Sequence, residues 1–176
     1  MLFRSRPGRA AHAFQSLSLL LSALAQRVEL DARGCVARPL RLLDVGCAYA
    51  VGSLGLVHRY YPYELTGVEW SAATRQYLQS QGANVYPSLE SIPEGELFDA
   101  VILNDVLEHV PDPLAFLRQV KRCSQPNVVV WINVPDFSWW RMKAVVDDLK
   151  AGATVVPKDL NPWEHLSYFK IGRAHV

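Results

Sequence analysis

The feature that most constrains the fold is a series of short apolar runs that alternate with helix-like segments. The runs are rich in Val, Ile and Leu, and each ends at a polar or small residue. They lie at 41–46, 64–70, 84–88, 98–105 and 127–134. Strands that are buried on both faces and separated by helices form parallel sheets of right-handed βαβ units. The sequence therefore predicts an α/β fold, a Rossmann-like doubly wound sheet with about five parallel strands.

Helix start and stop signals stand between these runs. Ser71 is predicted to cap a helix that Gly82 closes, and Asp112 to cap a helix with Pro113 at its first position. A further helix is expected from about Ser53. These signals support alternation of strand and helix along the whole central part of the chain.

Residues 1–37 are predicted to be an N-terminal helical arm, because apolar residues recur there at helical spacing. These residues are Phe14, Leu17, Leu20, Leu21, Leu24 and Val28. A secretory signal peptide is the alternative interpretation, since arginines precede the apolar run and Ala23-Leu24-Ala25 resembles a cleavage site. The run is too short to cross a membrane, so no membrane span is predicted.

Charge and cysteine content narrow the class of protein. The chain has 176 residues and a net charge of +1, which gives no general case for a nucleic-acid partner. Arginines give the first 41 residues a basic excess that could meet RNA or a membrane surface, although a solvated face is the favoured interpretation. Cys35, Cys47 and Cys123 are far apart and form no CxxC motif, which favours reduced thiols in the cytoplasm.

The carboxyl ends of parallel strands are where ligands bind in such sheets. Gly46 ends the first strand, at a point where the chain must turn sharply and a ligand can approach the backbone. Glu69 ends the second strand, 23 residues later, at the place where a carboxylate can accept hydrogen bonds from both hydroxyls of a ribose. The turn is poor in glycine, so it suits a ligand without phosphates better than a pyrophosphate.

Four blocks in the right order resemble class I S-adenosylmethionine-dependent methyltransferases. They are LLDVGCA, GVEWS, FDAVILNDVLEHVPDP and VVVWINVPD. The chain is most similar to the small-molecule group with an LEHVxDP segment after strand four. The resemblance covers a cofactor-binding domain at 38–136 and extends to EHLSYF at 164–169. It implies methyl transfer from S-adenosylmethionine to a small-molecule acceptor, such as a sugar or a lipid precursor.

The resemblance also implies where the cofactor lies. The turn at 44–50 would lie beneath the methionine part, Glu69 would hold the ribose, and Trp70 would lie beside the adenine. The residues after strand three would border the adenine edge, and those after strand four would face the amino-acid end. The implied contacts are Asp44, Gly46, Cys47, Ala48, Tyr49, Ala50, Glu69, Trp70, Ser88, Leu89, Asn104 and Asp105. Most family members have glycine at positions 48 and 50, so Ala50 is the departure expected to affect cofactor affinity.

His109 is the candidate catalytic group, because an oxygen nucleophile needs a base and imidazole titrates near neutrality. A packing role in the Leu-Glu-His-Val-Pro segment is the alternative. Adjacent Glu108 and His109 are weak support for a shared ion, so no metal site is predicted.

The segment 137–170 is rich in aromatic residues and is predicted to be a substrate lid, with a satellite core as the alternative. Because of Pro157 and Pro162, it is not expected to be regular structure throughout. The predicted lid residues are Trp139, Trp140, His165 and Tyr168. Residues 171–176, IGRAHV, resemble the translation of a sequencing-adapter oligonucleotide and are predicted to be a non-native tail. The family's final two strands are therefore expected to be missing, as in a C-terminally truncated chain.

Two other functions compete with methyl transfer. A nicotinamide-dependent oxidoreductase expects G-x-G-x-x-G, but Ala48 and Val51 occupy two of the required glycine positions. A non-catalytic methyltransferase-like binding domain is compatible with Ala50 and with a missing C-terminal part. The sequence specifies no oligomeric state.

Overall fold

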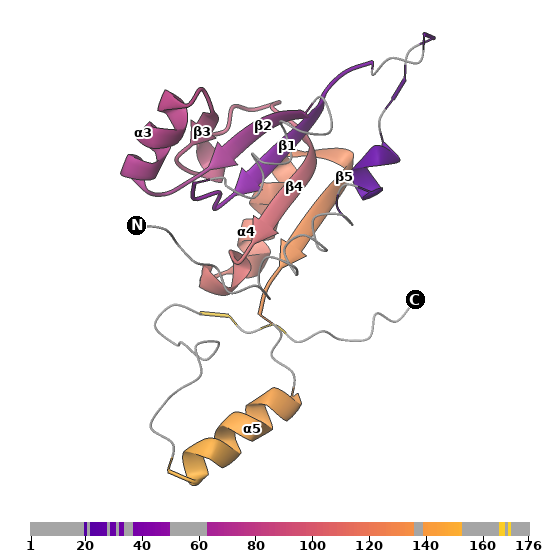
Figure 1. Ribbon diagram of the computed structural model, residues 1–176. Coiled ribbons are helices and arrows are strands. Elements are labelled where there is room, and N and C mark those ends of the chain that lie inside the picture. Colours follow the sequence, from indigo (N-terminus) through magenta and orange to yellow (C-terminus); the bar gives the residue numbers. More distant parts are fainter. Residues whose placement is uncertain are drawn as a thin grey trace.

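The computed structural model describes residues 20, 22–27, 29–30, 32–33, 37–49, 63–135, 139–152, 166–167 and 169. Its centre is a five-stranded sheet in the order β3-β2-β1-β4-β5, in which every neighbouring pair is parallel (Figure 1). The strands are β1 (Leu40–Val45), β2 (Tyr63–Val68), β3 (Asn84–Tyr86), β4 (Phe98–Asn104) and β5 (Ser124–Asn133). The predicted Rossmann-like sheet of five parallel strands is thereby confirmed.

The helices that the structure describes between and after these strands are α3 (Ala72–Ser80), η1 (Leu89–Ser91), η2 (Leu107–His109), α4 (Pro113–Arg122) and α5 (Trp139–Lys150), where η marks a 3-10 turn. Two of them, α3 and α4, begin at the predicted caps. The Ser71 hydroxyl accepts a hydrogen bond from Thr74 N, and Asp112 Oδ1 accepts one from Ala115 N. The helix expected from Ser53 lies outside the described residues.

Strand register brings the ligand-binding ends of the strands together. Val45 at the end of β1 is opposite Val68 of β2 and Leu103 of β4. Leu103 is in turn opposite Ile132 of β5. The chain runs outward from β1 through β2 to β3 and then crosses to β4, so the order reverses between β1 and β4. A crevice at such a switch point is where doubly wound sheets bind ligands.

Alternate residues of the central strands face two separate cores. Leu43 and Val45 of β1 lie with Leu103 in a cluster that includes Val120 of α4. Leu42 and Ile102 belong to the cluster on the opposite face. This alternation follows from the two-residue period of a strand, and it explains why β1 and β4 are apolar throughout.

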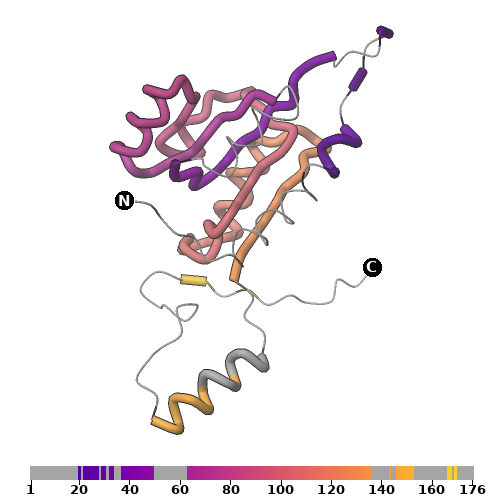
Figure 2. Tube along the Cα trace, in the orientation of Figure 1, coloured from indigo at the N-terminus to yellow at the C-terminus, as the bar shows by residue number. Residues whose placement is uncertain are grey.

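The second core includes part of the N-terminal arm. Leu20 and Leu24 are buried against the sheet, near Val129 and Trp131 of β5. Figure 2 shows this helical turn, in indigo, alongside β5. Burial of two residues four positions apart is what a packing helix requires. Among the helices that the structure describes, none combines the length and apolar character needed to cross a membrane.

The aromatic segment after β5 contains more regular structure than the sequence suggests. Trp139 and Trp140 form the first turn of α5, a helix of 12 residues. Figure 1 shows α5 beyond the carboxyl ends of β4 and β5. The prolines that argue against helix, Pro157 and Pro162, follow α5 and do not interrupt it. The irregularity inferred from them does not extend to 139–150.

A charged network joins the starts of β1 and β4. Both Arg38 side-chain nitrogens Nη1 and Nη2 donate to the Asp99 carboxylate, at 2.8 Å each, and the backbone N–H of Arg41 donates to Asp99 Oδ2 at 2.9 Å. The hydrogen bonds from Arg38 hold the pKa of the buried Asp99 carboxyl below its usual range. Such charge-assisted, bidentate pairs are among the stronger hydrogen bonds in proteins.

Asp99→Asn is expected to lower the free energy of unfolding by about 1–3 kcal/mol at neutral pH, because it weakens hydrogen bonds to a charged group. The folded pKa of Asp99 is depressed, so its contribution is present above the unfolded pKa of about 3.9 and is lost as pH falls through the folded pKa. Urea titrations should therefore show the two proteins converging in acid.

Asp147→Asn is the matched control, because Asp147 pairs with Lys143 at 2.6 Å but is exposed. This variant should change the free energy of unfolding by less than about 1 kcal/mol. Equal losses in the two variants would contradict a structural role for the Asp99 network.

Candidate cofactor site

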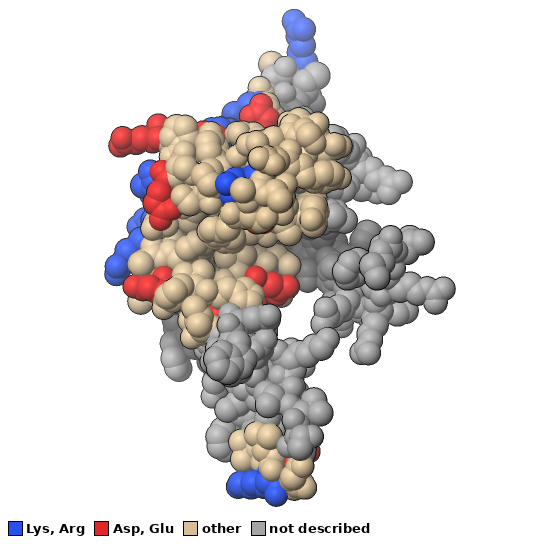
Figure 3. Space-filling model, turned by 90° about the vertical axis from the view of Figure 1, so that its left-hand side faces the viewer, with Lys and Arg blue, Asp and Glu red and all other residues tan. Residues whose placement is uncertain are grey.

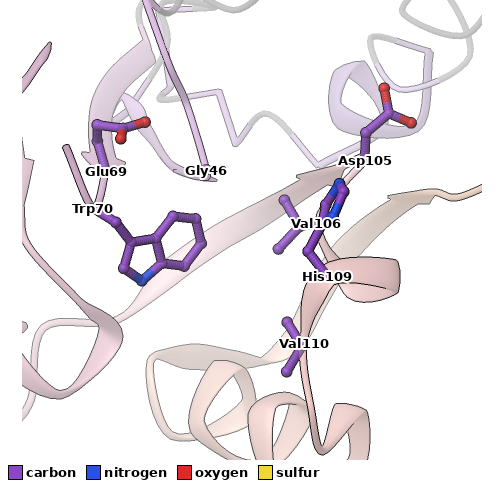
Figure 4. A pocket seen from close by; sticks show the side chains of 7 residues that line it. All are labelled: Gly46, Glu69, Trp70, Asp105, Val106, His109 and Val110. Atoms are coloured by element: carbon purple, nitrogen blue, oxygen red, sulfur yellow. The ribbon is translucent and has the colours of Figure 1, made fainter. Parts of the chain in front are cut away.

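A cavity of about 280 Å³ opens at the switch point between β1 and β4. Its lining comes from the turns after three strands, β1, β2 and β4. The lining residues are Gly46, Glu69, Trp70, Asp105, Val106, His109 and Val110. Figure 4 shows Glu69 and Trp70 on one side, with Val106, His109 and Val110 facing them across the cavity.

Gly46 is the residue that lets the first turn approach its neighbours. Its φ is +69°, and a Cβ there would lie 2.8 Å from Val106 Cγ2 and 3.2 Å from the Trp70 ring. The N–H groups of Gly46 and Cys47 both donate to the carbonyl of Val68, at 2.8 and 3.1 Å. The turn is therefore closed against β2, and only glycine fits without displacing a wall of the cavity.

Glu69 links the turns after β1 and β2. Its side chain is 9% exposed; Oε2 accepts from Ala48 N at 2.9 Å and Oε1 accepts from Ser71 N at 2.7 Å. Each carboxylate oxygen has a second lone-pair site, so the group can still accept two hydrogen bonds from a ligand. Because the two backbone contacts hold the carboxylate in place, a pair of adjacent hydroxyls fits its remaining capacity.

Trp70 separates the first cavity from a second one of about 440 Å³. Trp70 is 53% exposed, and the two cavities share Trp70, His109 and Val110. The predicted adenine-edge residues Ser88 and Leu89 line the second cavity. A large exposed aromatic side chain between two adjoining hollows provides a flat surface for a ring.

The second cavity also contains residues that were not predicted as cofactor contacts. Glu90 of η1 lies just after β3, among the strand-end positions where a ligand contact is expected, and Phe116 and Gln119 come from α4. The pKa of Glu90 is lowered, chiefly by a hydrogen bond from its own backbone and then by Ser88. The strand-end rule does not extend to the two α4 residues, which join this cavity through tertiary packing.

The turn after β4 forms the opposite wall. Asp105 has a left-handed φ of +53°, and its backbone N–H donates to the carbonyl of Asn133 at 2.9 Å. Asn133 Nδ2 also donates to Asn104 Oδ1 and Asp105 Oδ1, at 3.2 Å each. Asn133 was not predicted as a site residue, although it ends a strand as Asn104 does. The signal that could have identified Asn133 is its place at the carboxyl end of β5, the strand next to β4 in the sheet.

His109 ends η2 and lines both cavities. Its backbone N–H donates to the Val106 carbonyl at 3.0 Å, so the ring is carried by a short helical turn. The neighbouring Glu108 is 2% exposed, and its Oε2 has no hydrogen-bond partner. Across the described residues, no three His, Cys, Asp or Glu side chains lie close enough together to hold a metal ion.

The other predicted turn residues that the structure describes do not line either cavity. Asp44 and Cys47 are buried, while Tyr49 is exposed and meets the Tyr77 ring edge-on with centroids 5.6 Å apart. Ala48 has a left-handed φ of +46° and contributes its N–H to Glu69. Ala50 lies outside the described residues.

Only part of the predicted lid can be placed. Trp139 and Trp140 are in the first turn of α5, and His165 and Tyr168 lie outside the described residues. The N–H groups of Leu166 and Ser167, between the latter two, donate to the Glu108 carbonyl at 2.6 and 3.0 Å. This segment therefore passes next to η2, which carries His109.

One described face of the molecule shows no concentration of charge. Seen from the side of α3 and β3, most acidic and basic side chains lie around the margin of a largely uncharged area, with basic atoms also visible within it (Figure 3). No block of one sign gathers on the described part of this face. A nucleic-acid surface normally shows a basic patch.

The family model for methyltransferase domains matches residues 9–173. The chain therefore belongs to the methyltransferase domain family, and its sheet is that of class I S-adenosylmethionine-dependent methyltransferases. S-adenosylmethionine is the methyl donor of this class.

The curated relatives include ubiquinone biosynthesis O-methyltransferases. One, from Histophilus somni, is 22% identical over 164 residues, which cover 86% of this chain and 67% of the relative. Another, from Alkalilimnicola ehrlichii, is 33% identical over 96 residues, which cover 49% of this chain and 38% of the relative.

Solved methyltransferase structures share the fold. A sarcosine dimethylglycine methyltransferase structure from Galdieria sulphuraria has a TM-score of 0.58 at 19% identity, and the match covers 81% of this chain and 56% of that protein's chain. A plantazolicin methyltransferase in complex with SAH (S-adenosylhomocysteine) has a TM-score of 0.51 at 15% identity, and the match covers 69% of this chain and 46% of that protein's chain. The chain thus spans about half the length of these two proteins.

Gly46→Ala is expected to weaken S-adenosylhomocysteine binding at least tenfold, because the added Cβ collides with Val106. Gly82→Ala is the control: Gly82 also has a positive φ, of +83°, but a Cβ there meets nothing within 4 Å. Both variants carry a left-handed backbone cost of about 1–2 kcal/mol. Calorimetric titration should show lost affinity for Gly46→Ala alone; equal affinities would mean that this turn does not contact the ligand.

Cys47 is expected to resist alkylation in the folded protein. Burial is the main cause that raises the pKa of its thiol to about 12, followed by the charges of Asp44 and Glu69. Because the thiolate is the reactive form, little is present near pH 8. Iodoacetamide labelling followed by peptide mass spectrometry should detect modified Cys47 only after unfolding in urea; rapid labelling of the native protein would contradict its burial beneath the turn.

Proposed function

We propose that this protein is an S-adenosylmethionine-dependent methyltransferase that acts on a small-molecule acceptor. The observation that carries the proposal is the Glu69 carboxylate, buried at the cavity and oriented by Ala48 N and Ser71 N. Its remaining acceptor capacity matches the two ribose hydroxyls of the methyl donor. Family membership supplies the chemical class.

The proposed binding mode uses both cavities. Glu69 takes the ribose, and the Trp70 ring packs against the adenine, with Ser88 and Leu89 at its edge. The turns containing Gly46 and Asp105 then enclose the amino-acid end. The two cavities have volumes of about 280 and 440 Å³, and together they reach the usual size of small-molecule sites, roughly 300–1,000 Å³.

We propose His109 as the base for an oxygen acceptor. S-adenosylmethionine, when bound, supplies a methyl group that is already activated by its positive sulfur. The chain must therefore align the acceptor, exclude water and accept its proton. His109 lies on the wall facing Glu69, where an imidazole nitrogen can accept a hydroxyl proton. Oxygen is the proposed acceptor atom because the curated relatives are named O-methyltransferases.

The predicted lid is proposed to cover the acceptor. The hydrogen bonds from Leu166 and Ser167 to the Glu108 carbonyl support this placement, because they hold the C-terminal segment beside η2. His165 and Tyr168 flank this short stretch in sequence.

We also propose a cytoplasmic location, since the methyl donor is a cytosolic metabolite.

Glu69→Gln is expected to weaken S-adenosylmethionine binding roughly tenfold or more, because an amide cannot accept at both positions. Glu64→Gln is the matched control, since Glu64 is an exposed residue near the start of β2, the strand that Glu69 directly follows. Isothermal titration of the whole chain with S-adenosylmethionine and, separately, NADH measures both effects. Absence of S-adenosylmethionine binding by the wild type would overturn the proposal.

Turnover distinguishes an enzyme from a binding-only domain. Release of S-adenosylhomocysteine should be followed with a panel of catechols and phenols as oxygen acceptors. His109→Gln should lower the rate by about 100-fold or more and leave S-adenosylmethionine affinity nearly unchanged. Tight cofactor binding without release for any acceptor would favour the non-catalytic alternative.

A further inference from the structure

Strands β4 and β5 end in the same residue type at the same register position. Asn104 is the partner of Asn133 in the parallel ladder, and both side chains are exposed. The Asn133 amide bridges the last residue of β4 and the first residue of the turn that follows, because its Nδ2 reaches Asn104 Oδ1 and Asp105 Oδ1 at 3.2 Å each. The carbonyl of Asn133 accepts a third hydrogen bond, from Asp105 N. One residue of β5 therefore holds the end of β4 and the following turn with three hydrogen bonds.

That turn needs support because of its backbone conformation. Asp105 has a φ of +53°, in the left-handed region, which Asp and Asn tolerate better than other non-glycine residues. Such conformations cost of order 1–3 kcal/mol and persist where surrounding contacts determine them. The Asn133 contacts, with the 3.3 Å hydrogen bond from Asn104 Nδ2 to Asp105 Oδ2, are contacts of this kind.

The supported turn determines where one wall of the first cavity lies. Val106 follows Asp105, is buried, and lies so close to Gly46 that a Cβ there would be 2.8 Å from Val106 Cγ2. The Val106 carbonyl then accepts from His109 N at 3.0 Å. A displacement of Asp105 would therefore also move Val106 and the turn that carries His109. Both lie on the side of the cavity that faces Glu69 (Figure 4).

We propose that Asn133 is a positioning residue for the cofactor cavity, acting through the left-handed conformation of Asp105. The inference rests on the proposed function, because it assigns Asn133 to the cavity that takes the methyl donor. Asn133 does not line that cavity itself. Its amide maintains the separation between the Glu69 side and the His109 side, so that bound ligand meets a wall that is already in place.

Asn133→Ala is the first test, with S-adenosylhomocysteine as the probe because it needs no acceptor. The variant should bind the probe about 5- to 10-fold more weakly in calorimetric titration, as expected when two hydrogen bonds that hold a wall are lost. Asn127→Ala is the matched control, since Asn127 is an exposed asparagine near the other end of the same strand. It should bind as the wild type does.

A second set of variants, in which the residue types at positions 133 and 105 are exchanged, tests whether Asn133 influences probe binding through Asp105. N133D removes the donor and opposes two carboxylates, so it should bind more weakly than Asn133→Ala. The double variant N133D/D105N restores one donor and one acceptor, and Asn also tolerates a left-handed φ. It should bind the probe to within about threefold of the D105N single variant, which is the reference because Asp105 itself lines the cavity. A general loss of stability would not produce this recovery.

The outcomes separate this inference from the proposed function. Normal binding by Asn133→Ala, or a folded N133D/D105N protein that binds much more weakly than the D105N single variant, would overturn the role of Asn133 and leave the methyltransferase proposal intact. Failure of the wild type to bind S-adenosylhomocysteine would instead remove the proposed function. Urea midpoints for every variant establish that binding is compared among folded proteins.

Discussion

In-register pairing of β1 with β2 and β4 is the constraint on which the rest of the structure depends. Val45 is opposite both Val68 and Leu103, so three strands finish at one level. The turns that follow must then share one small space, where Gly46, Glu69 and Val106 meet. Burial of the central strands on both faces makes this register costly to change, because a one-residue slip would exchange side chains between two closely packed cores. The cavity is thus a consequence of the core.

Backbone donors, more than charged side chains, organise the site. The Val68 carbonyl accepts the N–H groups of Gly46 and Cys47, and the Glu69 carboxylate accepts those of Ala48 and Ser71. These contacts join two turns that are distant in the chain. They also account for a cofactor turn with little glycine: the structure requires glycine at 46, where a Cβ would collide, and accommodates a left-handed alanine at 48. A ligand without phosphates places no further demand on the turn.

The sequence was sufficient to predict the helices and strands that have strong local signals. Ser71 and Asp112 cap helices as expected, and the five apolar runs are strands, although β5 starts at Ser124 instead of 127. It also brought Glu69, Trp70 and His109 to one cavity. It missed α5, because Pro157 and Pro162 obscured the helix that precedes them, and it missed Asn133, because an asparagine at a strand end carries no distinctive local pattern.

What the sequence by itself determined is the period of the apolar residues, the caps and the order of chemically distinct blocks, because each depends on residues close together in the chain. Tertiary structure alone decided which turns oppose one another. The contact between Gly46 and Val106, the left-handed Asp105 and its amide partner in β5 join residues 28 or more positions apart. Such contacts arise from strand order and register, which no local pattern encodes, and they set the shape of the cavity.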